Sequence, residues 1–282
     1  MTTATDTASE WGIEKIDVPA YLERIGHTGP TEPTVATLTA LQRAHILGIP
    51  FENLDIILGR GVQLDLETVQ NKLVTLGRGG YCHEHNLLFA AVLERLGFSL
   101  TRLLCRVRLG NAPGQVQSRS HSVLIVEVDG QRYLSDAGYG CLGPLEPVPL
   151  VDGAVSEQDG WKYRIHQEGP ITALQMLNND VWVDSVAFDT TLFHPVDFTM
   201  ANFGSSHYPR SPLVVALFTQ AVLEGPDGIV RKALFGKTIQ DFTTGGIANQ
   251  RVLSPAELVA ELRDTMRIRL TDEDIKQIEE LG

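Results

Sequence analysis

The chain has 282 residues, and its 23 Lys and Arg against 35 Asp and Glu give a formal net charge of −12. Nucleic-acid binding relies on a basic face, so this charge balance argues against a nucleic acid as partner. Basic clusters such as Arg102, Arg106 and Arg108 are short and could serve only a small anionic ligand. A hydrophobic content of 43% is typical of a soluble globular protein, and no apolar stretch reaches the ~18 residues of a membrane helix.

The cysteines and the N-terminus indicate where the protein works. Three cysteines are too few, and odd in number, for a disulfide framework, which favours a reducing compartment. Residues Met1–Glu10 are rich in Thr, Ser and Ala and lack the basic and apolar runs of a signal peptide. The expected location is therefore the cytoplasm, away from any membrane.

The first zone of the chain, from about Val18 to Gly97, has the periodicity of helices. Apolar residues recur at spacings of three and four in Tyr21–Ile25, Val35–Ile46, Val69–Leu76 and Leu87–Leu96. Gly97 is placed to close the last of these helices in a left-handed conformation. A bundle of helices is expected.

The second zone, from Ser99 to about Asp184, switches to a period of two. In Leu100–Leu109 one face carries apolar side chains and the other carries arginines, as in a half-buried strand. Further strands are expected at Ser120–Val128, Gln131–Asp136, Trp161–His166, Ala173–Leu177 and Val181–Val186. Short strands separated by Gly, Pro and Asp turns predict an antiparallel barrel or sandwich.

The third zone, from about Asp197, mixes the two patterns. Its expected elements are a helix near Phe198–Phe203, strands in Leu213–Leu223 and Ile229–Phe235, and helices Pro255–Met266 and Asp272–Glu280. Ser254, Pro255 and Glu257 form a capping-box pattern at the start of one helix. The whole chain is predicted to belong to the α+β class.

Candidate catalytic residues first occur in the segment Arg78-Gly79-Gly80-Tyr81-Cys82-His83-Glu84-His85-Asn86. The two glycines allow a tight turn, and the helical pattern begins directly afterwards, so Cys82 falls at or just inside a helix N-terminus. The partial positive charge at that end favours a thiolate, which makes Cys82 a candidate nucleophile. Burial as a small hydrophobe is an equally good account of a lone cysteine.

A metal site at the same place is a weaker interpretation. On a helix, Cys82 and His85 would share one face while His83 points away, and no second ligand pair follows. The run also lacks zinc-site patterns such as His-Glu-x-x-His. No metal is therefore expected.

A predicted hairpin supplies a partner for the cysteine. Asp129-Gly130 is a strong two-residue turn signal between two alternating runs. The register that this turn sets pairs Glu127 with Arg132 and Ile125 with Leu134, and both are favourable cross-strand pairs.

The same register brings an imidazole and a carboxylate together. Val123 faces Asp136, and His121 lies diagonally from Asp136 on the same face, at roughly 7–8 Å between backbones. Such a pair is the base and orienting group that a cysteine nucleophile needs, although a strand-end histidine and a turn-forming aspartate also fit these positions. A slip of one residue would send the two to opposite faces.

The other cysteines and histidines suggest structural roles. Cys105 lies on the apolar face of its strand, and Cys141 lies in a Gly-rich loop five residues after Asp136, with nothing nearby to activate it. Solvated or capping positions without a readable acidic partner are expected for His166, His194 and His207.

Together these segments resemble the arylamine N-acetyltransferases. Arg78-Gly79-Gly80-Tyr81-Cys82, followed by Glu84 and Asn86, is similar to the active-cysteine motif of that family. Pro50-Phe51-Glu52-Asn53-Leu54 resembles its upstream motif, and His121 with Ser135-Asp136-Ala137-Gly138-Tyr139-Gly140 matches its Cys-His-Asp order and spacing. Through this resemblance, which covers nearly the whole chain, we expect a helical bundle (1–98) carrying the cysteine, a β-barrel (99–204) carrying the histidine and aspartate, and an α/β lid (205–282), with a cysteine-protease-like core.

The resemblance also implies a reaction. Cys82 would take an acetyl group from acetyl-CoA and pass it, by a ping-pong mechanism, to an arylamine, an arylhydroxylamine or a hydrazine. His121 would act as the base and Asp136 would hold the imidazole, while Arg78 and Glu52 would form a structural ion pair. The residues expected to bind substrate are Tyr139, Gly138, Phe203 and Phe51. The implied partners are CoA and a small aromatic amine, with a homodimer allowed and no metal.

Three residues depart from the family pattern. His83 stands where aromatic residues are common, Ser120 where threonine is frequent, and Tyr139 where phenylalanine is frequent. These changes alter the polarity of the pocket and leave the Cys-His-Asp triad intact. The segment Asn202–Pro209 resembles the family's cofactor-cleft stretch loosely.

Other functions use the same three residues. An amide synthase that moves a carrier-bound acyl chain onto an aromatic amine shares the fold, and papain-like or transglutaminase-like thiol hydrolases use a similar triad. The lack of a secretion signal argues against a secreted protease. A binding protein on the same scaffold would tolerate loss of the triad, whereas all three members are present here.

Overall fold

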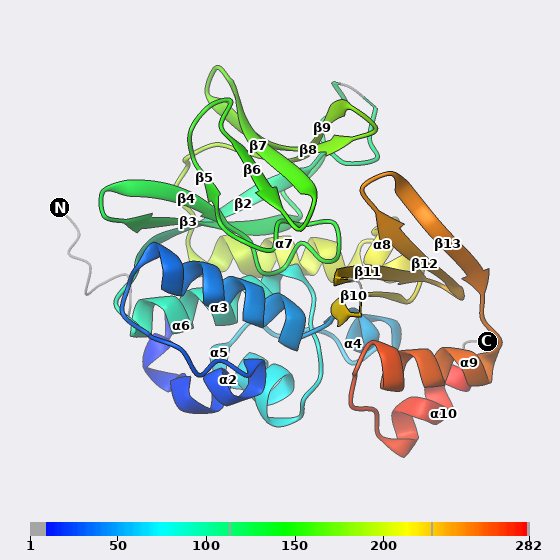
Figure 1. The fold of residues 1–282 in the computed structure, drawn as a ribbon. Coiled ribbons are helices and arrows are strands. Elements are labelled where there is room, and N and C mark those ends of the chain that lie inside the picture. Colours follow the sequence, from blue (N-terminus) through cyan, green and yellow to red (C-terminus); the bar gives the residue numbers. More distant parts are fainter. Residues whose placement is uncertain (1–9, 113, 227, 281–282) are drawn as a thin grey trace.

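Two antiparallel sheets and their flanking helices make up the computed structural model, which describes residues 10–112, 114–226 and 228–280 (Figure 1). The larger sheet lies above the N-terminal helices, and the smaller sheet lies beside them, next to the C-terminal helices. Among the described residues, no helix combines the length and the apolar character that a bilayer span needs. The α+β class expected from the sequence is confirmed.

The N-terminal helices form the first part of the molecule. After a short turn η1 (Ile13–Lys15), they are α2 (Val18–Ile25), α3 (Val35–Gly48), α4 (Leu54–Ile57), α5 (Leu66–Gln70) and α6 (Cys82–Arg95). The side chains of Asp17, Thr34 and Asp65 cap α2, α3 and α5 by accepting a backbone hydrogen bond from the first turn. Helix α6 is buried from Cys82 to Leu93, because the other helices and the larger sheet pack around it.

The larger sheet has eight strands within the described residues, in the order β5-β4-β3-β2-β9-β8-β7-β6. They are β2 (Ser99–Val107), β3 (His121–Val128), β4 (Gln131–Ser135), β5 (Val148–Pro149), β6 (Val155–Gln158), β7 (Trp161–Glu168), β8 (Ile171–Asn178) and β9 (Val181–Phe188). The sheet curls until β5 contacts β7, and a bridge joins Asp152 to Ile165, so the barrel is nearly closed. Its interior is apolar and includes Cys105, as expected.

The hairpin register predicted from the turn is confirmed. In β3 and β4, Glu127 pairs with Arg132 and Ile125 pairs with Leu134. Asp129 and Gly130 both have positive φ, at 52° and 72°, which is the backbone that a two-residue hairpin turn requires.

The smaller sheet has the order β1-β10-β11-β12-β13. Its strands are β1 (Phe51–Glu52), β10 (Phe218–Gly225), β11 (Gly228–Phe235), β12 (Thr238–Thr243) and β13 (Gly246–Val252). The helices of this part of the chain are α7 (Pro195–His207), α8 (Pro212–Val215), α9 (Pro255–Ala260) and α10 (Asp272–Glu280). Strand β1 belongs to the N-terminal segment but pairs with β10, and α7 runs across residue 204, so the three expected parts interlock.

One expected strand begins in the wrong place. The sequence pattern predicts a strand over Leu213–Leu223, whereas Pro212–Val215 forms helix α8 and the strand starts at Phe218. Pro212 is favourable at the first helical position. In addition, the Asn53 side chain fixes the turn, because it donates to the carbonyls of Leu213 and Ala216 and accepts from the backbone N–H of Phe218.

Two of the expected helices switch from α-helical to π-helical hydrogen bonding in their last turn. Beyond α5 the chain forms a π-helical turn, η2 (Asn71–Thr75), and beyond α9 it forms a second, η3 (Glu261–Thr265). The short strands β1, β5, β6, β12 and β13 were not expected, because two to seven residues with mixed polarity carry little periodicity.

Candidate active site

Cys82 is the first residue of α6, directly after an extended Tyr81. The carboxylate of Glu84 accepts a hydrogen bond from the Tyr81 backbone N–H at 3.0 Å, which fixes the start of the helix. Gly79 is required in the preceding turn, because a Cβ there would lie 2.2 Å from the Pro50 carbonyl oxygen. Local backbone packing therefore places the thiol at the helix N-terminus, as predicted.

His121 and Asp136 form a buried pair. The distance between His121 Nε2 and Asp136 Oδ2 is 2.6 Å, and the two residues are only 4% and 1% exposed. Both side chains lie on the face of the hairpin that the register predicted. Because Nε2 binds the carboxylate, Nδ1 is the nitrogen left to exchange a proton with a thiol.

Asn86 holds the aspartate in place. Its amide nitrogen donates to Asp136 Oδ1 at 2.9 Å and to the Ser122 carbonyl at 2.7 Å, and its amide oxygen accepts from the Ala137 N–H at 2.9 Å. Sequence reasoning noted Asn86 in the motif without giving it this role. Its spacing of four residues from Cys82, which puts both on one helix face, was the available signal.

The charge on His121 follows from its neighbours. Burial by itself lowers the pKa of His121, but the charge and the hydrogen bond of Asp136, with smaller effects from Cys82, outweigh it and raise the pKa to about 10. At neutral pH the imidazole is therefore protonated. The result is an imidazolium beside the cysteine, held by a buried carboxylate.

A cavity of about 1010 Å³ opens onto Cys82 and His121. All four residues expected to bind substrate line it: Phe51, Gly138, Tyr139 and Phe203. Sequence reasoning missed several other apolar wall residues, which come from distant segments: Val107, Leu109, Leu142, Met200, Leu213 and Phe218. The cavity is thus large, and most of its lining is apolar.

Two departures from the family pattern lie in this wall. The ring of Tyr139 stands perpendicular to that of His121, with centroids 5.4 Å apart. The Ser120 carbonyl oxygen lies 3.7 Å from Cys82 Sγ and also accepts from the hydroxyl of Ser205 at 3.4 Å. His121 is therefore flanked by the Tyr139 ring, and the thiol by a backbone acceptor.

The third departure, His83, is isolated. Its side chain is 1% exposed, and neither ring nitrogen has a hydrogen-bond partner among the described residues. Its ring packs edge-on against Tyr81 and Phe198. Burial, and then the charge of His121, lower the pKa of His83 to about 3, so the ring is neutral.

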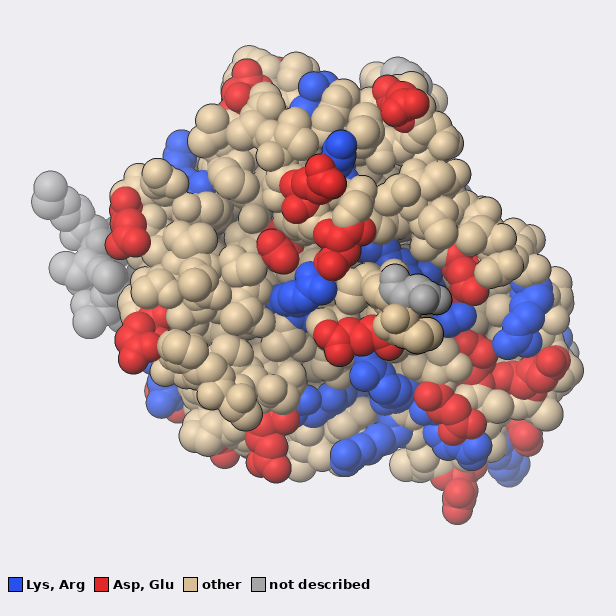
Figure 2. Space-filling view, viewed as in Figure 1, with Lys and Arg blue, Asp and Glu red and all other residues tan. Residues whose placement is uncertain are grey.

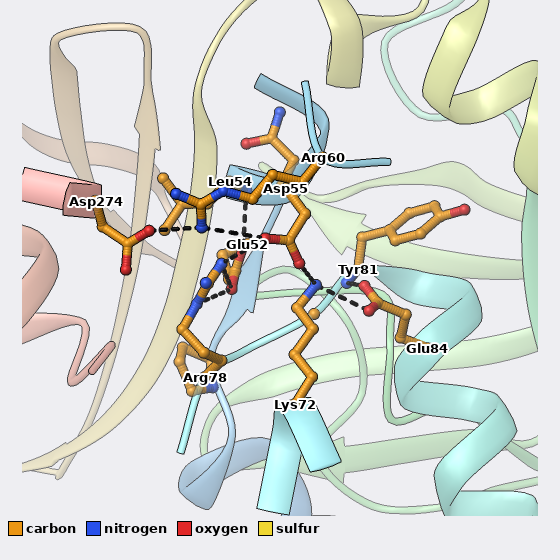
Figure 3. Close-up of polar contacts among 12 residues, drawn as sticks. Glu52, Leu54, Asp55, Arg60, Lys72, Arg78, Tyr81, Glu84 and Asp274 are labelled. Carbon is orange, nitrogen blue, oxygen red and sulfur yellow. Dashed lines mark hydrogen bonds and ion pairs between the residues drawn. The ribbon is translucent and has the colours of Figure 1, made fainter. Parts of the chain in front are cut away.

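An ion-pair network supports the loop before Cys82 (Figure 3). The expected pair is present, since Arg78 Nε lies 2.9 Å from Glu52 Oε1. Arg78 also reaches Asp55 at 3.3 Å, and Lys72 bridges Asp55 at 2.7 Å and Glu84 at 2.8 Å. Burial lowers the pKa of Lys72 and of Arg78, but the surrounding carboxylates raise both above their ordinary values.

The network continues to the C-terminal helix. Arg60 lies 2.6 Å from Asp274 of α10 and 3.8 Å from Asp55. Figure 3 shows these side chains converging from β1, α4, η2 and α10. Through them the turn that precedes the nucleophile is tied to the last helix of the fold.

His85 takes part in a second buried chain rather than in a metal site. His85 Nδ1 lies 2.7 Å from His45 Nε2, and His45 Nδ1 lies 2.7 Å from the Tyr21 hydroxyl. His85 Nε2 meets the Gly80 carbonyl at 3.0 Å, so the chain runs from Tyr21 to the turn before Cys82. The described residues contain no cluster of three or more metal-ligating side chains.

The outlying histidines are solvated, as expected, but they also have partners that the sequence did not indicate. His194 is the residue before α7, as a capping role predicts, but it also has an acidic partner, with Nδ1 3.1 Å from Glu10. His166 lies 4.0 Å from Asp152. His207 stacks on Phe203 with centroids 4.5 Å apart and lines the cavity. Glu10 and Asp152 are distant in sequence from their histidines, and Phe203 lies one helix turn from His207. The alternation of residues along a strand could not predict these contacts.

Known proteins resemble this chain in sequence. An N-acetyltransferase family model matches residues 34–275. The arylamine N-acetyltransferase of Escherichia coli K12 is 39% identical over 191 residues, 68% of each chain, and that of Mycobacterium bovis is 34% identical over 261 residues, 91% of each chain. The chain belongs to the arylamine N-acetyltransferase family. It is accordingly an acetyltransferase.

Solved structures of this family share the fold. The arylamine N-acetyltransferase of Mycobacterium abscessus superposes with a TM-score of 0.88 at 33% identity and covers 96% of both chains. The Mycobacterium marinum arylamine N-acetyltransferase in complex with CoA gives a TM-score of 0.86 at 32% identity, over 94% of this chain and 99% of that one. The barrel, the helices and the smaller sheet are therefore the family architecture.

Proposed function

We propose that this acetyltransferase carries an acetyl group from acetyl-CoA, through a thioester on Cys82, to the nitrogen of an arylamine or hydrazine, or to the oxygen of an arylhydroxylamine. The observation that carries the proposal is the meeting of Cys82 with the His121–Asp136 pair at a large apolar cavity. The related Mycobacterium marinum structure with CoA supports the choice of donor.

In the first half-reaction, the Cys82 thiolate attacks the thioester carbon of acetyl-CoA. The bond between that carbon and the CoA sulfur breaks, and the His121 imidazolium gives its proton to the departing CoA thiolate. Asp136 remains ionised and holds the ring. The products are acetyl-Cys82, free CoA and a neutral His121.

In the second half-reaction, the amine nitrogen attacks the acetyl-Cys82 carbonyl. The neutral His121 takes the amine proton, and the carbon–sulfur bond breaks to return the Cys82 thiolate. The imidazolium and thiolate of the resting enzyme are thereby restored. Because the acyl enzyme is a free intermediate, the kinetics are ping-pong.

The remaining residues support this chemistry. Phe51, Gly138, Tyr139 and Phe203 bind the substrates in the cavity that they line, while Arg78 and Glu52 act structurally. No metal is needed, because the thiolate supplies the nucleophile. A cytoplasmic location and a homodimer stay predictions.

Intact mass after incubation with acetyl-CoA and no amine tests the assignment. The wild type should gain one acetyl group and release CoA, and Cys82→Ala should do neither. Cys105→Ala and Cys141→Ala are matched controls, because both thiols are buried and burial raises the pKa of each. Acylation of Cys82→Ala at a near-normal rate would refute the proposal, and rapid loss of the adduct to water would indicate a thiol hydrolase.

A further inference from the structure

The loop after Asp136 contacts Cys82, His121 and Asp136, the three residues of the triad. The Gly138 N–H donates to Asp136 Oδ1 at 2.9 Å. Gly138 also packs so closely on Cys82 that an added Cβ would lie 2.7 Å from the Cys82 carbonyl oxygen. The next residue, Tyr139, stands against the His121 ring. A shift of this loop would therefore disturb the relation of Cys82 to His121.

The smaller sheet holds this loop from behind. Arg231 of β11 donates through Nη1 to the carbonyl of Cys141 at 2.6 Å and to that of Gly143 at 2.8 Å. Gln220 of β10 accepts from the Cys141 N–H at 2.9 Å. Cys141 and Gly143 are thus held by two side chains, from strands β10 and β11, that come much later in the chain.

Arg231 is an unfavourable residue to bury at this position. It is fully buried, and both of its side-chain hydrogen bonds within the described residues go to neutral carbonyls rather than to a carboxylate. Its Nε and Nη2 have no hydrogen-bond partner in the described part of the chain, and its guanidinium lies 4.5 Å from the Trp161 ring centroid. The carboxylate of Asp159 acts on Arg231 through its charge and forms no hydrogen bond with it in the described structure. A buried cation without a directly paired carboxylate lowers stability relative to an apolar chain of similar size, so stability alone is a poor account of Arg231.

We propose that Arg231 is a positioning residue of the active site. By holding the carbonyls of Cys141 and Gly143, it keeps Gly138 against Cys82 and Tyr139 against His121. Strand β11 then supports the catalytic centre without lining the substrate cavity itself. This inference rests on the proposed function of Cys82 and His121.

The test compares Arg231→Met with Lys232→Met. Lys232 is the next residue of β11, lies on the opposite face of the strand, and pairs with Asp241 at 2.5 Å, so it is a matched control for the loss of a cation. For each variant we would measure the rate of acetyl-Cys82 formation, and the rate of Cys82 alkylation by iodoacetamide across pH. Arg231→Met should slow acylation by about tenfold or more, as small misplacements do, and should move alkylation to higher pH.

Further variants keep the test decisive. Arg231→Lys retains donors for the two carbonyls and should recover part of the rate. If Arg231→Met does not fold, Gln220→Met, which removes the acceptor for the Cys141 N–H, should show the same displaced pH profile in a milder form. Equal profiles for wild type, Gln220→Met and whichever Arg231 variants fold would overturn the inference. A wild type that forms no adduct would instead overturn the proposed function, and the inference with it.

Discussion

The imidazolium of His121 depends on one carboxylate. Burial lowers the pKa of His121, and Asp136 is the largest of the influences that raise it to about 10. Asp136→Asn removes that influence, so the pKa of His121 should fall and the ring should lose its charge near neutral pH. Without the imidazolium the Cys82 thiolate loses its partner.

Alkylation measures this loss directly. In the wild type, iodoacetamide should modify Cys82 rapidly at neutral pH, because the His121 imidazolium stabilises a thiolate beside it. In Asp136→Asn the rate at about pH 6–7 should drop by about tenfold or more, while the rate above pH ~9 converges on the wild type. A variant with the wild-type pH profile would show that the pair does not control the thiol.

His83 lowers stability in its present surroundings. Both ring nitrogens are buried without partners among the described residues, and each unsatisfied polar group costs about 1–3 kcal/mol. His83→Phe keeps a planar ring between Tyr81 and Phe198 and removes both nitrogens, so the free energy of unfolding should rise by about 1–2 kcal/mol. Urea denaturation would show a higher midpoint at unchanged slope.

The sign of the pH dependence sharpens this prediction. The pKa of His83 is lowered to about 3 in the fold, so the unfolded chain binds a proton below about pH 6.5 that the folded chain does not. The advantage of His83→Phe should therefore grow as the pH falls from about 6.5. His207→Phe, which changes an exposed imidazole, is the control; an equal gain there would contradict the explanation.

At the residue scale, the contacts that follow from local turn and strand geometry could be predicted from the sequence. The Asp129-Gly130 turn determines which residues of the hairpin share a face, and this was enough to bring His121 to Asp136. The isolation of His83 depends on α7, which packs there only in the folded molecule, and no spacing along the chain carries that information. The stacking of His207 on Phe203 is a contact between residues four apart on one helix, and it could be predicted only once α7 was known to reach His207.

The turn into α6 leaves no room for a side chain at Gly79. A side chain at Gly79 would strike the Pro50 carbonyl and the Glu52 side chain, and would separate β1 from the loop that carries Cys82. Gly79→Ala should lower the free energy of unfolding by more than about 3 kcal/mol, in the range of severe backbone strain.

A second glycine provides the comparison. Gly204 lies in α7, where a Cβ added to it would meet nothing within 4 Å, so Gly204→Ala should raise stability by up to about 1 kcal/mol through helix propensity. Thermal and urea unfolding of the two variants would measure the contrast. Similar losses in both would mean that the close contact at Gly79 is not what requires glycine there.

The π-turns show why element boundaries escape the sequence. In η2 and η3 the backbone shifts to hydrogen bonds such as Leu76 N–H to Asn71 and Met266 N–H to Glu261, yet the apolar spacing continues as in an α-helix. Each turn ends in a left-handed residue, Gly77 in one case and Arg267 in the other. A glycine indicates that backbone in the sequence, whereas an arginine does not.

At the scale of the whole molecule, the buried histidines make the free energy of unfolding depend on pH, both below and above neutral pH. Burial holds the pKa of His45 well below its ordinary value and that of His85 at about 4, so stability should fall as the pH drops below about 6.5 and the unfolded chain takes up protons. His121, whose pKa is raised to about 10, acts oppositely: its contribution is complete below about pH 6.5 and is lost as the pH rises toward 10.

The stability profile should therefore decline in both directions from near pH ~6.5. Urea midpoints measured from about pH 5 to about 9.5 would trace it, with a slope of up to about 1.4 kcal/mol per pH unit for each titrating histidine. His121→Gln should flatten the alkaline limb and leave the acid limb in place. An alkaline limb that persists in His121→Gln would assign it to other groups.

The surface charge agrees with the composition. On the face in Figure 2, acidic and basic side chains are interspersed. The fold class and the location of the cysteine, histidine and aspartate were accessible from the sequence, because turns, caps and strand alternation are local. The apolar cavity was only partly accessible, because its walls come from β1, α7, α8 and β10 at once.

The placement of β1 has a consequence for synthesis on the ribosome. Phe51 and Glu52 emerge before their strand partners, Gln220 and Thr219, and Arg60 emerges before the Asp274 that it meets. Contacts of such long sequence separation form late and slow the approach to the native state. A nascent chain can thus display the cysteine-bearing helix α6 long before the strands and helix that fix the preceding turn have been made, so the active site is complete only after the segment from Thr219 to Asp274 has been synthesised.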